Sequence, residues 1–264
     1  MADYTPSTVR SQTLAQLASR EGWRLELPHA RPHHLFLHIS KGQGRTILLG
    51  RRRGLTMNST LFIPAGTLMM LDIGRQSYGQ AVEIPTEAGL TLPSDPVQLR
   101  VHDSLAQAEL IAIIDAMQRE QATHRPFGAE ALRAHAGLLS VWLRRNLSAE
   151  PATIGAPKAA DRLAAAFCAL VERDFRAGQS MADYAAALGV TPTHLTRTLR
   201  QTAGITAADI LTGRSLHEAR HMLQDGTLPI GLISEMLGFS SAAYFTRFIQ
   251  KHTGKTPTAL RRRA

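Results

Sequence analysis

A segment that occurs twice in the last third of the chain constrains the fold more than any other feature. One copy begins at Leu188 and the other at Leu237. In both, the leucine precedes a glycine and an apolar residue, and a hydroxyl residue follows. Both then contain an apolar–Thr–Arg run, whose arginines, Arg197 and Arg247, lie 50 positions apart. A glycine that can end one helix and a hydroxyl residue that can cap the next are typical of a helix-turn-helix. The sequence therefore predicts two helix-turn-helix units.

The second helix of each unit is predicted to have one buried and one exposed face. In the first unit Thr191 is the expected N-cap and Pro192 the first helical residue. Leu195 and Leu199 lie one turn apart and are expected to point inward. The residues expected to be buried in the second unit are Phe245, Phe248 and Ile249.

The opposite face of each second helix carries the side chains predicted to contact DNA bases. Arg and Gln can read the edges of guanine and adenine in the major groove, and Thr can contact the thymine methyl group. The predicted base contacts are Thr193, Thr196, Arg197 and Arg200 in the first unit, and Ala243, Thr246, Arg247 and Gln250 in the second.

The positive charge of the chain is concentrated at the same end. Residues 158–264 contain 14 Lys and Arg against 8 Asp and Glu, whereas residues 1–157 contain 16 against 13. This distribution is expected if the C-terminal part faces phosphates. The predicted phosphate contacts are Lys251, Lys255, Arg261, Arg262 and Arg263.

Residues from about Asp161 to Arg263 closely resemble the DNA-binding domain of AraC/XylS-type transcription regulators. The pattern is carried by Ile230, Ile233, Gly238, Phe239, Tyr244, Phe245, Arg247, Phe248, Gly254, Thr256, Pro257 and Arg261, and in the joining helix by Arg214, Leu216, Ala219, Arg220 and Leu223. Ser234, Leu199 and Leu260 depart mildly from it. The resemblance implies a regulator, not an enzyme, that binds double-stranded promoter DNA. It also implies a homodimer, contact with RNA polymerase if the protein is an activator, and an unidentified small-molecule effector.

The N-terminal part is predicted to be β-rich. Short apolar runs separated by Gly and Pro occupy about residues 20–104, and two amphipathic helices are expected near 106–121 and 128–147. This part resembles, more weakly, the cupin-like domain that often precedes the DNA-binding domain. The fold class expected is thus an α+β two-domain protein. It comprises a cupin-like barrel or sandwich with helices for effector sensing and dimerisation (1–147), a linker (148–159) and an all-α domain (160–264).

Three sequence features leave alternatives open. Arg51, Arg52 and Arg53 are expected at a solvated hairpin tip, with a phosphate contact or an acidic-effector site as alternatives. A metal-dependent cupin enzyme is the rival from another class. However, strand residues His34 and His38 would lie ~13 Å apart, too far to share one ion at ~2.1 Å, so no metal or cofactor is predicted. Cys168 lies in an apolar helical run and is expected in the core; a methyl-accepting cysteine is the alternative.

The remaining composition favours a cytoplasmic, nucleoid-associated protein. No apolar run approaches the roughly 20 residues that span a bilayer, and residues 1–20 contain no signal-peptide core. A single cysteine excludes an internal disulfide, as is usual in a reducing compartment. No membrane partner is therefore expected.

Overall fold

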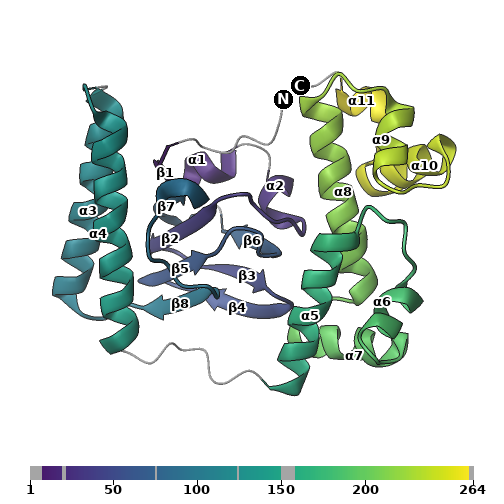
Figure 1. The fold of residues 1–264 in the computed structure, drawn as a ribbon, viewed down its shortest axis with the longest axis horizontal. Helices are drawn as coiled ribbons and strands as arrows, with labels where there is room; N and C mark the ends of the chain where they lie inside the picture. The colour runs from purple at the N-terminus through teal and green to yellow at the C-terminus, as the bar shows by residue number, and fades with distance from the viewer. Residues whose placement is uncertain (1–7, 20–21, 75, 124, 150–157, 262–264) are drawn as a thin grey trace.

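Two antiparallel sheets form the N-terminal part of the chain (Figure 1). The structure, a computed structural model, describes residues 8–19, 22–74, 76–123, 125–149 and 158–261. The five-stranded sheet has the order β1 (Arg10–Thr13), β7 (Tyr78–Ile84), β2 (His34–Lys41), β5 (Ser59–Ile63) and β8 (Val97–Arg100). The three-stranded sheet has the order β4 (Arg51–Leu55), β3 (Gly44–Leu48) and β6 (Met69–Ile73).

The two sheets pack face to face around one apolar core. Leu37 and Leu61 of the five-stranded sheet belong to the same buried cluster as Leu48, Leu55 and Leu71 of the three-stranded sheet. Alternating residues of each strand point to one face, which places these side chains between the sheets. Of the two alternatives that the sequence left open, the described strands form a sandwich of two separate sheets and not a closed barrel.

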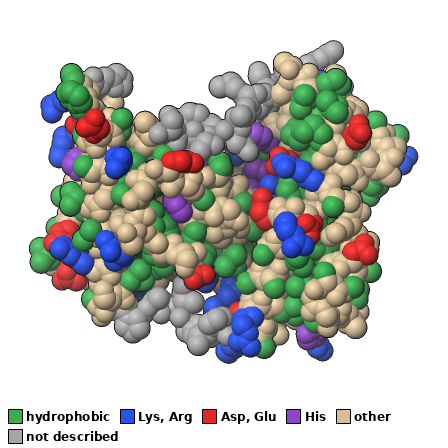
Figure 2. Space-filling view, viewed as in Figure 1, with side chains coloured by type: hydrophobic (Ala, Val, Ile, Leu, Met, Phe, Trp, Pro, Cys, Tyr) green, Lys and Arg blue, Asp and Glu red, His purple; other side chains and the backbone are tan. Residues whose placement is uncertain are grey.

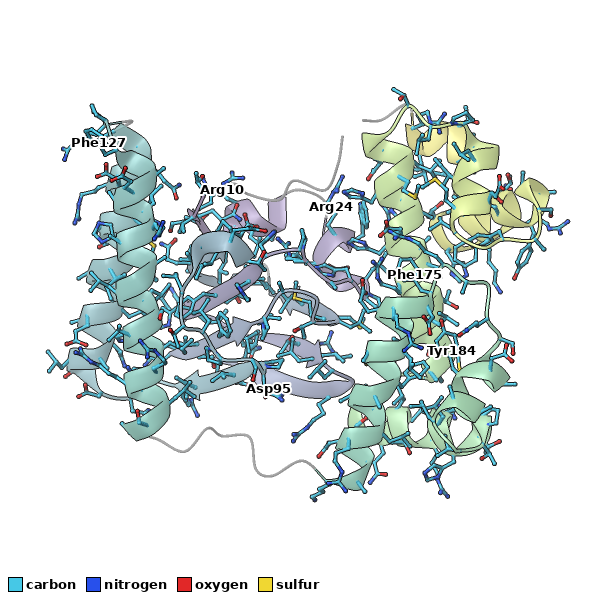
Figure 3. All side chains as sticks on the ribbon, viewed as in Figure 1. Arg10, Arg24, Asp95, Phe127, Phe175 and Tyr184 are labelled. Carbon is cyan, nitrogen blue, oxygen red and sulfur yellow. The ribbon has the colours of Figure 1, made fainter. Side chains whose placement is uncertain are left out.

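A pair of long helices covers the outer face of the five-stranded sheet (Figure 1). These are α3 (Ser104–Thr123) and α4 (Gly128–Ala149), and the expected helices at 106–121 and 128–147 are thus confirmed. Trp142 of α4 donates its indole N–H to the Ala106 carbonyl at 2.8 Å and packs edge-on against Phe36 of the sheet. Phe127, at the far tip of this pair, is 77% exposed and points away from the rest of the molecule (Figure 3).

Shorter helices fill the gaps around the sandwich. They are α1 (Leu14–Ser19), α2 (Trp23–Glu26) and the 3-10 turn η1 (Thr86–Ala88). Leu14 and Leu17 of α1 belong to the core between the sheets. Among the described residues, no helix combines the length and the apolar character that crossing a membrane requires.

The C-terminal part is helical throughout and has its own buried cluster. Phe167, Tyr184, Leu199 and Phe245, from four different helices, are all buried in it. The linker expected at 148–159 includes residues 150–157, which lie outside the described residues. The helices are α5 (Ala159–Asp174), α6 (Met181–Ala187), α7 (Pro192–Thr202), α8 (Ala207–Asp225), α9 (Ile230–Met236), α10 (Ala242–Thr253) and α11 (Pro257–Arg261).

The outer face of the three-stranded sheet packs against the C-terminal helices. Ile47 and Met70 from this face, together with Cys168 of α5 and Ile210 of α8, line a cavity of only about 10 Å³. The side chains around this cavity therefore leave almost no free space between the two parts. A Cβ atom at Gly213 of α8 would lie 2.6 Å from the Pro28 ring, so the close approach depends on the absence of a side chain there.

Candidate nucleic-acid interface

The first helix-turn-helix unit consists of α6, a tight turn and α7. Gly189 has φ +66°, the left-handed conformation that ends α6. The Thr191 hydroxyl accepts a hydrogen bond from the backbone N–H of His194 at 3.1 Å, and Pro192 is the first residue of α7. The cap and the proline predicted from the sequence are both confirmed, so the start of α7 is fixed by local contacts.

The second unit, α9 and α10, repeats this construction. Gly238 has φ +71°, and Ser241 caps α10 by accepting from the Tyr244 N–H at 3.1 Å. A Cβ atom at Gly238 would also lie 2.4 Å from the Arg176 carbonyl oxygen. Glycine is needed at this turn for its conformation and for the close approach of the loop that joins α5 to α6.

Both second helices bury the apolar face that the sequence predicts. Leu195 and Leu199 of α7 are fully buried, as are Phe245 and Ile249 of α10. Phe248, expected to be buried with them, is only half-buried because it lies at the edge of the apolar face. Its ring contacts Phe239 at 5.0 Å and His252 at 4.8 Å between centroids.

The residues predicted to contact bases lie on the opposite, accessible face of each helix. Thr196 and Thr246 are half-buried at equivalent positions, where each directly precedes the exposed arginine of its unit. The polar face predicted for each helix is therefore open to a partner. The exposed side chains are Thr193, Arg197 and Arg200 on α7, and Ala243, Arg247 and Gln250 on α10.

Two further side chains of this face were not predicted. The Nδ1 atom of His194 lies 3.1 Å from Nη2 of Arg197, so this exposed imidazole can accept a hydrogen bond from the arginine. Their i, i+3 spacing on one helix was the available signal. Tyr244 is 49% exposed next to Ala243. In the sequence it is identified only as part of the family pattern, without a predicted contact with DNA.

The residues predicted to contact phosphates differ in accessibility. Lys251 is exposed and Lys255 is half-buried. Arg261 is half-buried and donates to the Leu228 carbonyl, so part of its donor capacity is used inside the protein. Arg262 and Arg263 lie outside the described residues.

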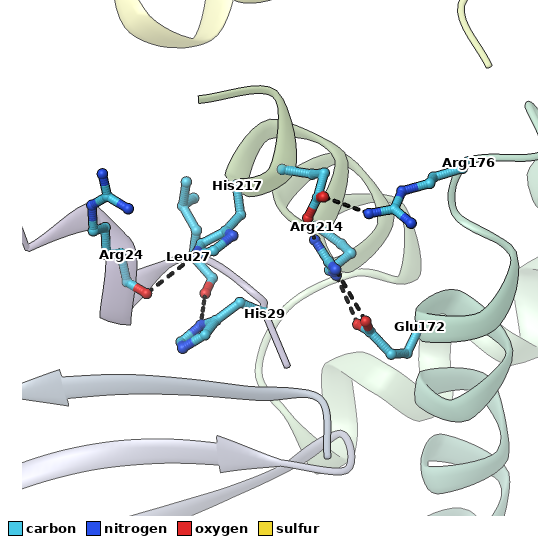
Figure 4. Close-up of polar contacts among 8 residues, drawn as sticks. Arg24, Leu27, His29, Glu172, Arg176, Arg214 and His217 are labelled. Carbon is cyan, nitrogen blue, oxygen red and sulfur yellow. Dashed lines mark hydrogen bonds and ion pairs between the residues drawn. The ribbon is translucent and has the colours of Figure 1, made fainter. Parts of the chain in front are cut away.

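Helix α8 joins the two units, which lie at its opposite ends (Figure 1). Arg214 in this helix is buried, and its guanidinium binds both carboxylate oxygens of Glu172 at 2.7 and 3.0 Å. It also donates to Glu218 at 2.9 Å, and Glu218 accepts a second bond from Arg176 (Figure 4). The ring of Phe175 lies 3.9 Å from the Arg214 guanidinium carbon. This network ties α5, the following loop and α8 into one unit.

The N-terminal part contacts the middle of α8 through a stack of aromatic rings. The imidazoles of His29 and His217 stack with centroids 4.7 Å apart and an angle of 7° between the planes. His29 lies 2.8 Å from the Leu27 carbonyl and His217 lies 3.2 Å from the Arg24 carbonyl (Figure 4). Trp23 packs edge-on against His217 at 5.3 Å. Burial, and then the charge of neighbouring cations, hold the pKa of both histidines well below its usual value.

Of the three arginines expected at a solvated hairpin tip, Arg51 and Arg53 are half-buried beside the C-terminal helices, whereas Arg52 is exposed. They belong to β4, and Gly50 before them packs so closely on Ala164 that an added Cβ would lie 2.9 Å from the alanine methyl carbon. Arg51 forms an ion pair with Asp161 of α5 at 3.1 Å. The expectation is wrong for Arg51 and Arg53, because a helix more than 100 positions away covers this side of the hairpin.

The residues considered for chemistry are used in packing. Nδ1 of His38 lies 3.0 Å from the Thr60 hydroxyl, and His34 accepts from the Ala65 N–H at 3.2 Å. Among the described residues no group of three His, Cys, Asp or Glu side chains could hold a metal ion. Cys168 is fully buried in α5, and burial raises the pKa of its thiol to about 12. The thiolate needed for nucleophilic attack is therefore scarce at neutral pH.

The capped helices α7 and α10 belong to two units that α8 joins, and each presents an exposed arginine. This arrangement defines a double helix-turn-helix domain. Residues 184–263 match the helix-turn-helix domain family, and the C-terminal domain is of the AraC type. The AraC/XylS-type resemblance inferred from the sequence is thus confirmed for these residues.

Named relatives share this part of the chain. The HTH-type transcriptional regulator GlxA of Rhizobium meliloti is 33% identical over 132 residues, which cover 48% of this chain and 41% of GlxA. The probable transcription factor PqrA of Proteus vulgaris is 38% identical over 73 residues, which cover 28% of this chain and 60% of PqrA. The chain thus spans less than two thirds of either relative. The crystal structure of ToxT from Vibrio cholerae O395 aligns with 96% of this chain and 95% of its own, at 12% identity and a TM-score of 0.40.

Proposed function

We propose that this protein is a sequence-specific DNA-binding transcription regulator that reads two successive major grooves of promoter DNA with α7 and α10. The observation that carries the proposal is the repeated construction. Each unit has a left-handed glycine, a hydroxyl cap and a second helix whose exposed face bears arginine. A single polar helix face is usually only solvated, whereas two at equivalent positions of a repeat favour a periodic partner such as duplex DNA.

The length of α8 fits this partner. Its 19 residues extend for about 28 Å at ~1.5 Å per residue. The widths of the units at its two ends bring the separation of the recognition helices toward the ~34–36 Å of one turn of B-DNA. A slightly shorter separation requires the DNA to bend between the two contacts.

The test is selection of binding sites from random duplexes, followed by single substitutions. Arg197→Ala is expected to weaken binding to the selected site by ~1–3 kcal/mol and to relax base preference in one half of it. Arg247→Ala should do the same in the other half. Equal weakening on selected and random duplexes would assign both arginines to phosphates, and failure to select any sequence would contradict the proposal.

The N-terminal sandwich is proposed to control this activity as the cupin-like, effector-binding and dimerisation domain. Support for dimerisation comes from Leu105, Ile111 and Leu138, apolar side chains of α3 and α4 that are 48–68% exposed. Ile111→Asp should convert a dimer into a monomer in sedimentation without unfolding it. An activator would in addition contact RNA polymerase, which transcription reconstituted on the selected site would reveal.

Support for effector control comes from the contact between the sandwich and α8. A ligand that changed the packing of Leu27 or His29 would act directly on the helix that separates the two units. The experiment is a thermal-shift screen of small metabolites on the whole protein, followed by DNA binding with each hit. A hit that raises the unfolding temperature but leaves DNA affinity unchanged would contradict control through α8.

A further inference from the structure

The three consecutive arginines of β4 have different surroundings, although they are adjacent in sequence. Arg51 is paired with Asp161 at 3.1 Å. Arg53 is half-buried, and its Nη1 atom is shielded from solvent. Arg52 is exposed, and no described residue forms a hydrogen bond or ion pair with it. The edge strand therefore holds one guanidinium that the fold itself does not use.

Arg52 lies beside the C-terminal end of the first recognition helix. A Cβ atom placed on Gly204 would be 3.5 Å from Nη1 of Arg52. The Gly204 N–H donates to the Arg200 carbonyl at 3.1 Å, so this glycine closes the last turn of α7. Packing of Gly50 on Ala164 and the Arg51–Asp161 pair hold β4 in this place.

The neighbourhood of Arg52 is strongly basic. Arg51 and Arg53 flank Arg52 on β4, and the exposed Arg200 lies one helical turn before Gly204 on α7. The acidic residues nearby are already occupied: Asp161 binds Arg51 and the Lys158 N–H, and Asp209 caps α8 through Thr206. Figure 2 shows Lys and Arg side chains gathered at the lower end of the junction between the sheets and the helices. An anionic partner would find little opposing charge there.

The spacing along α7 indicates which part of the DNA would lie next to this arginine. The predicted base contacts from Thr193 to Arg200 span ~10 Å along the helix axis and begin at the N-terminal end of α7, the end that contacts base edges when a recognition helix lies in the major groove. Gly204 lies ~6 Å beyond Arg200 in the chain direction, past the residues predicted to face the bases, so a side chain beside it would face the sugar-phosphate backbone. Arg52 extends from β4 at this point.

We propose that Arg52 binds a backbone phosphate at the edge of the groove read by α7, so that the N-terminal sandwich forms part of the DNA interface. The inference rests on the proposed function, and it adds a contact from outside the double helix-turn-helix domain. A phosphate contact supplies affinity and register without base preference. The sandwich would thus contribute to binding only while it is docked on α5 and α7.

The test is the salt dependence of binding by the full chain, with a duplex selected from a random pool and a random duplex of equal length. Each phosphate contact contributes ~0.9 to the slope of log affinity against log salt. Arg52→Gln should lower the magnitude of that slope by about 0.9. The ratio of the DNA affinity of the unsubstituted protein to that of the variant should therefore decrease about 3.5-fold between 50 and 200 mM salt. The loss should be equal on both duplexes, and Arg52→Lys should keep the slope. Arg133→Gln, an exposed arginine of α4, is the matched control.

The outcomes separate this inference from the proposed function. If Arg52→Gln binds with the unsubstituted slope while Arg197→Ala loses base preference, the inference is overturned and the function stands. If the chain selects no sequence and Arg197→Ala changes nothing, the proposed function fails. A lower unfolding temperature of Arg52→Gln with an unchanged slope would show that Arg52 only holds the two parts together, which also overturns the inference.

Discussion

Acidification should weaken the protein through the stacked histidines between the sandwich and α8. His29 is buried, His217 is half-buried, and their rings stack on each other. The buried atoms Nε2 of His29 and Nδ1 of His217 have no hydrogen-bond partner among the described residues. The neighbouring groups whose charge lowers the pKa of the pair come from the loop after α2, from α2 itself and from α8: Arg31, Arg24, Arg214 and His221. Two of them are paired with carboxylates, Arg31 with Glu83 and Arg214 with Glu172. A proton on either ring would therefore be buried among like charges.

The sign and size of the effect follow from the direction of the two pKa shifts. Both pKa values are lowered in the folded protein, so the unfolded chain binds more protons below its own pKa of ~6.5, and stability falls as pH decreases through that value. A histidine that stays neutral in the folded state at pH 5.5 costs about 1.4 kcal/mol relative to pH 7.5, and two such histidines cost about 2.8 kcal/mol. This is a large part of the ~5–15 kcal/mol that stabilises a typical protein.

The assay is urea unfolding at pH 7.5 and 5.5, followed by circular dichroism. The double variant His29→Gln, His217→Gln lacks both stacked imidazoles, so its stability should fall less between the two pH values, by about 2.8 kcal/mol at most. Comparison within each variant cancels any general effect of the substitutions. Other histidines with lowered pKa, such as His38, contribute equally to both proteins. The exposed His102→Gln should behave like the unsubstituted protein. An equal loss of stability in the double variant would refute the reasoning.

Three further predictions concern α8 and its contacts. Gly213→Ala should lower the thermal unfolding temperature of the full chain because the added methyl group meets the Pro28 ring, although alanine favours helices by ~1 kcal/mol. Adding Pro28→Ala should restore the unfolding temperature, and no recovery would refute the steric explanation. Glu172→Gln should destabilise the protein by ~1.5–3 kcal/mol in urea unfolding, because it weakens the two charge-assisted hydrogen bonds to the buried Arg214, which keeps its bond to Glu218. A loss below ~1 kcal/mol would contradict this. Five base pairs inserted between the two halves of the selected site should reduce affinity to the non-specific level in gel-shift titrations, and unchanged affinity would mean that only one unit enters a groove.

The recognition helices could be predicted from the sequence because their signals are local. The left-handed glycine, the hydroxyl cap and the apolar face of α7 lie within about a dozen residues, and their effects do not depend on distant contacts. At the edge of the apolar face, burial depends on whether neighbouring elements cover the side chain, which a local pattern does not give. Phe248 is half-buried for this reason.

The contacts between the two parts could not be predicted in the same way. Arg51 and Asp161 are 110 positions apart, and His29 and His217 are 188 positions apart. No periodicity links such residues. As long as the helix that covers it is unknown, a run of arginines has the pattern of an ordinary solvated turn. The choice between sandwich and barrel was open for a similar reason, because strand patterns give the faces of a sheet but not the pairing of its edges.

Because the sandwich is docked on α8, this helix must keep the rotation of its two ends about the helix axis as well as its length. Each residue inserted into an α-helix turns everything beyond it by about 100° and moves it about 1.5 Å. An insertion after Arg220 would rotate the second unit alone, away from a sandwich that still sits on Gly213 and His217. An insertion before Gly213 would instead turn the sandwich away from the first unit and break its contact with α5. Length changes among homologous chains should therefore be confined to the turns, and α8 should keep one residue count wherever the sandwich docks in this way.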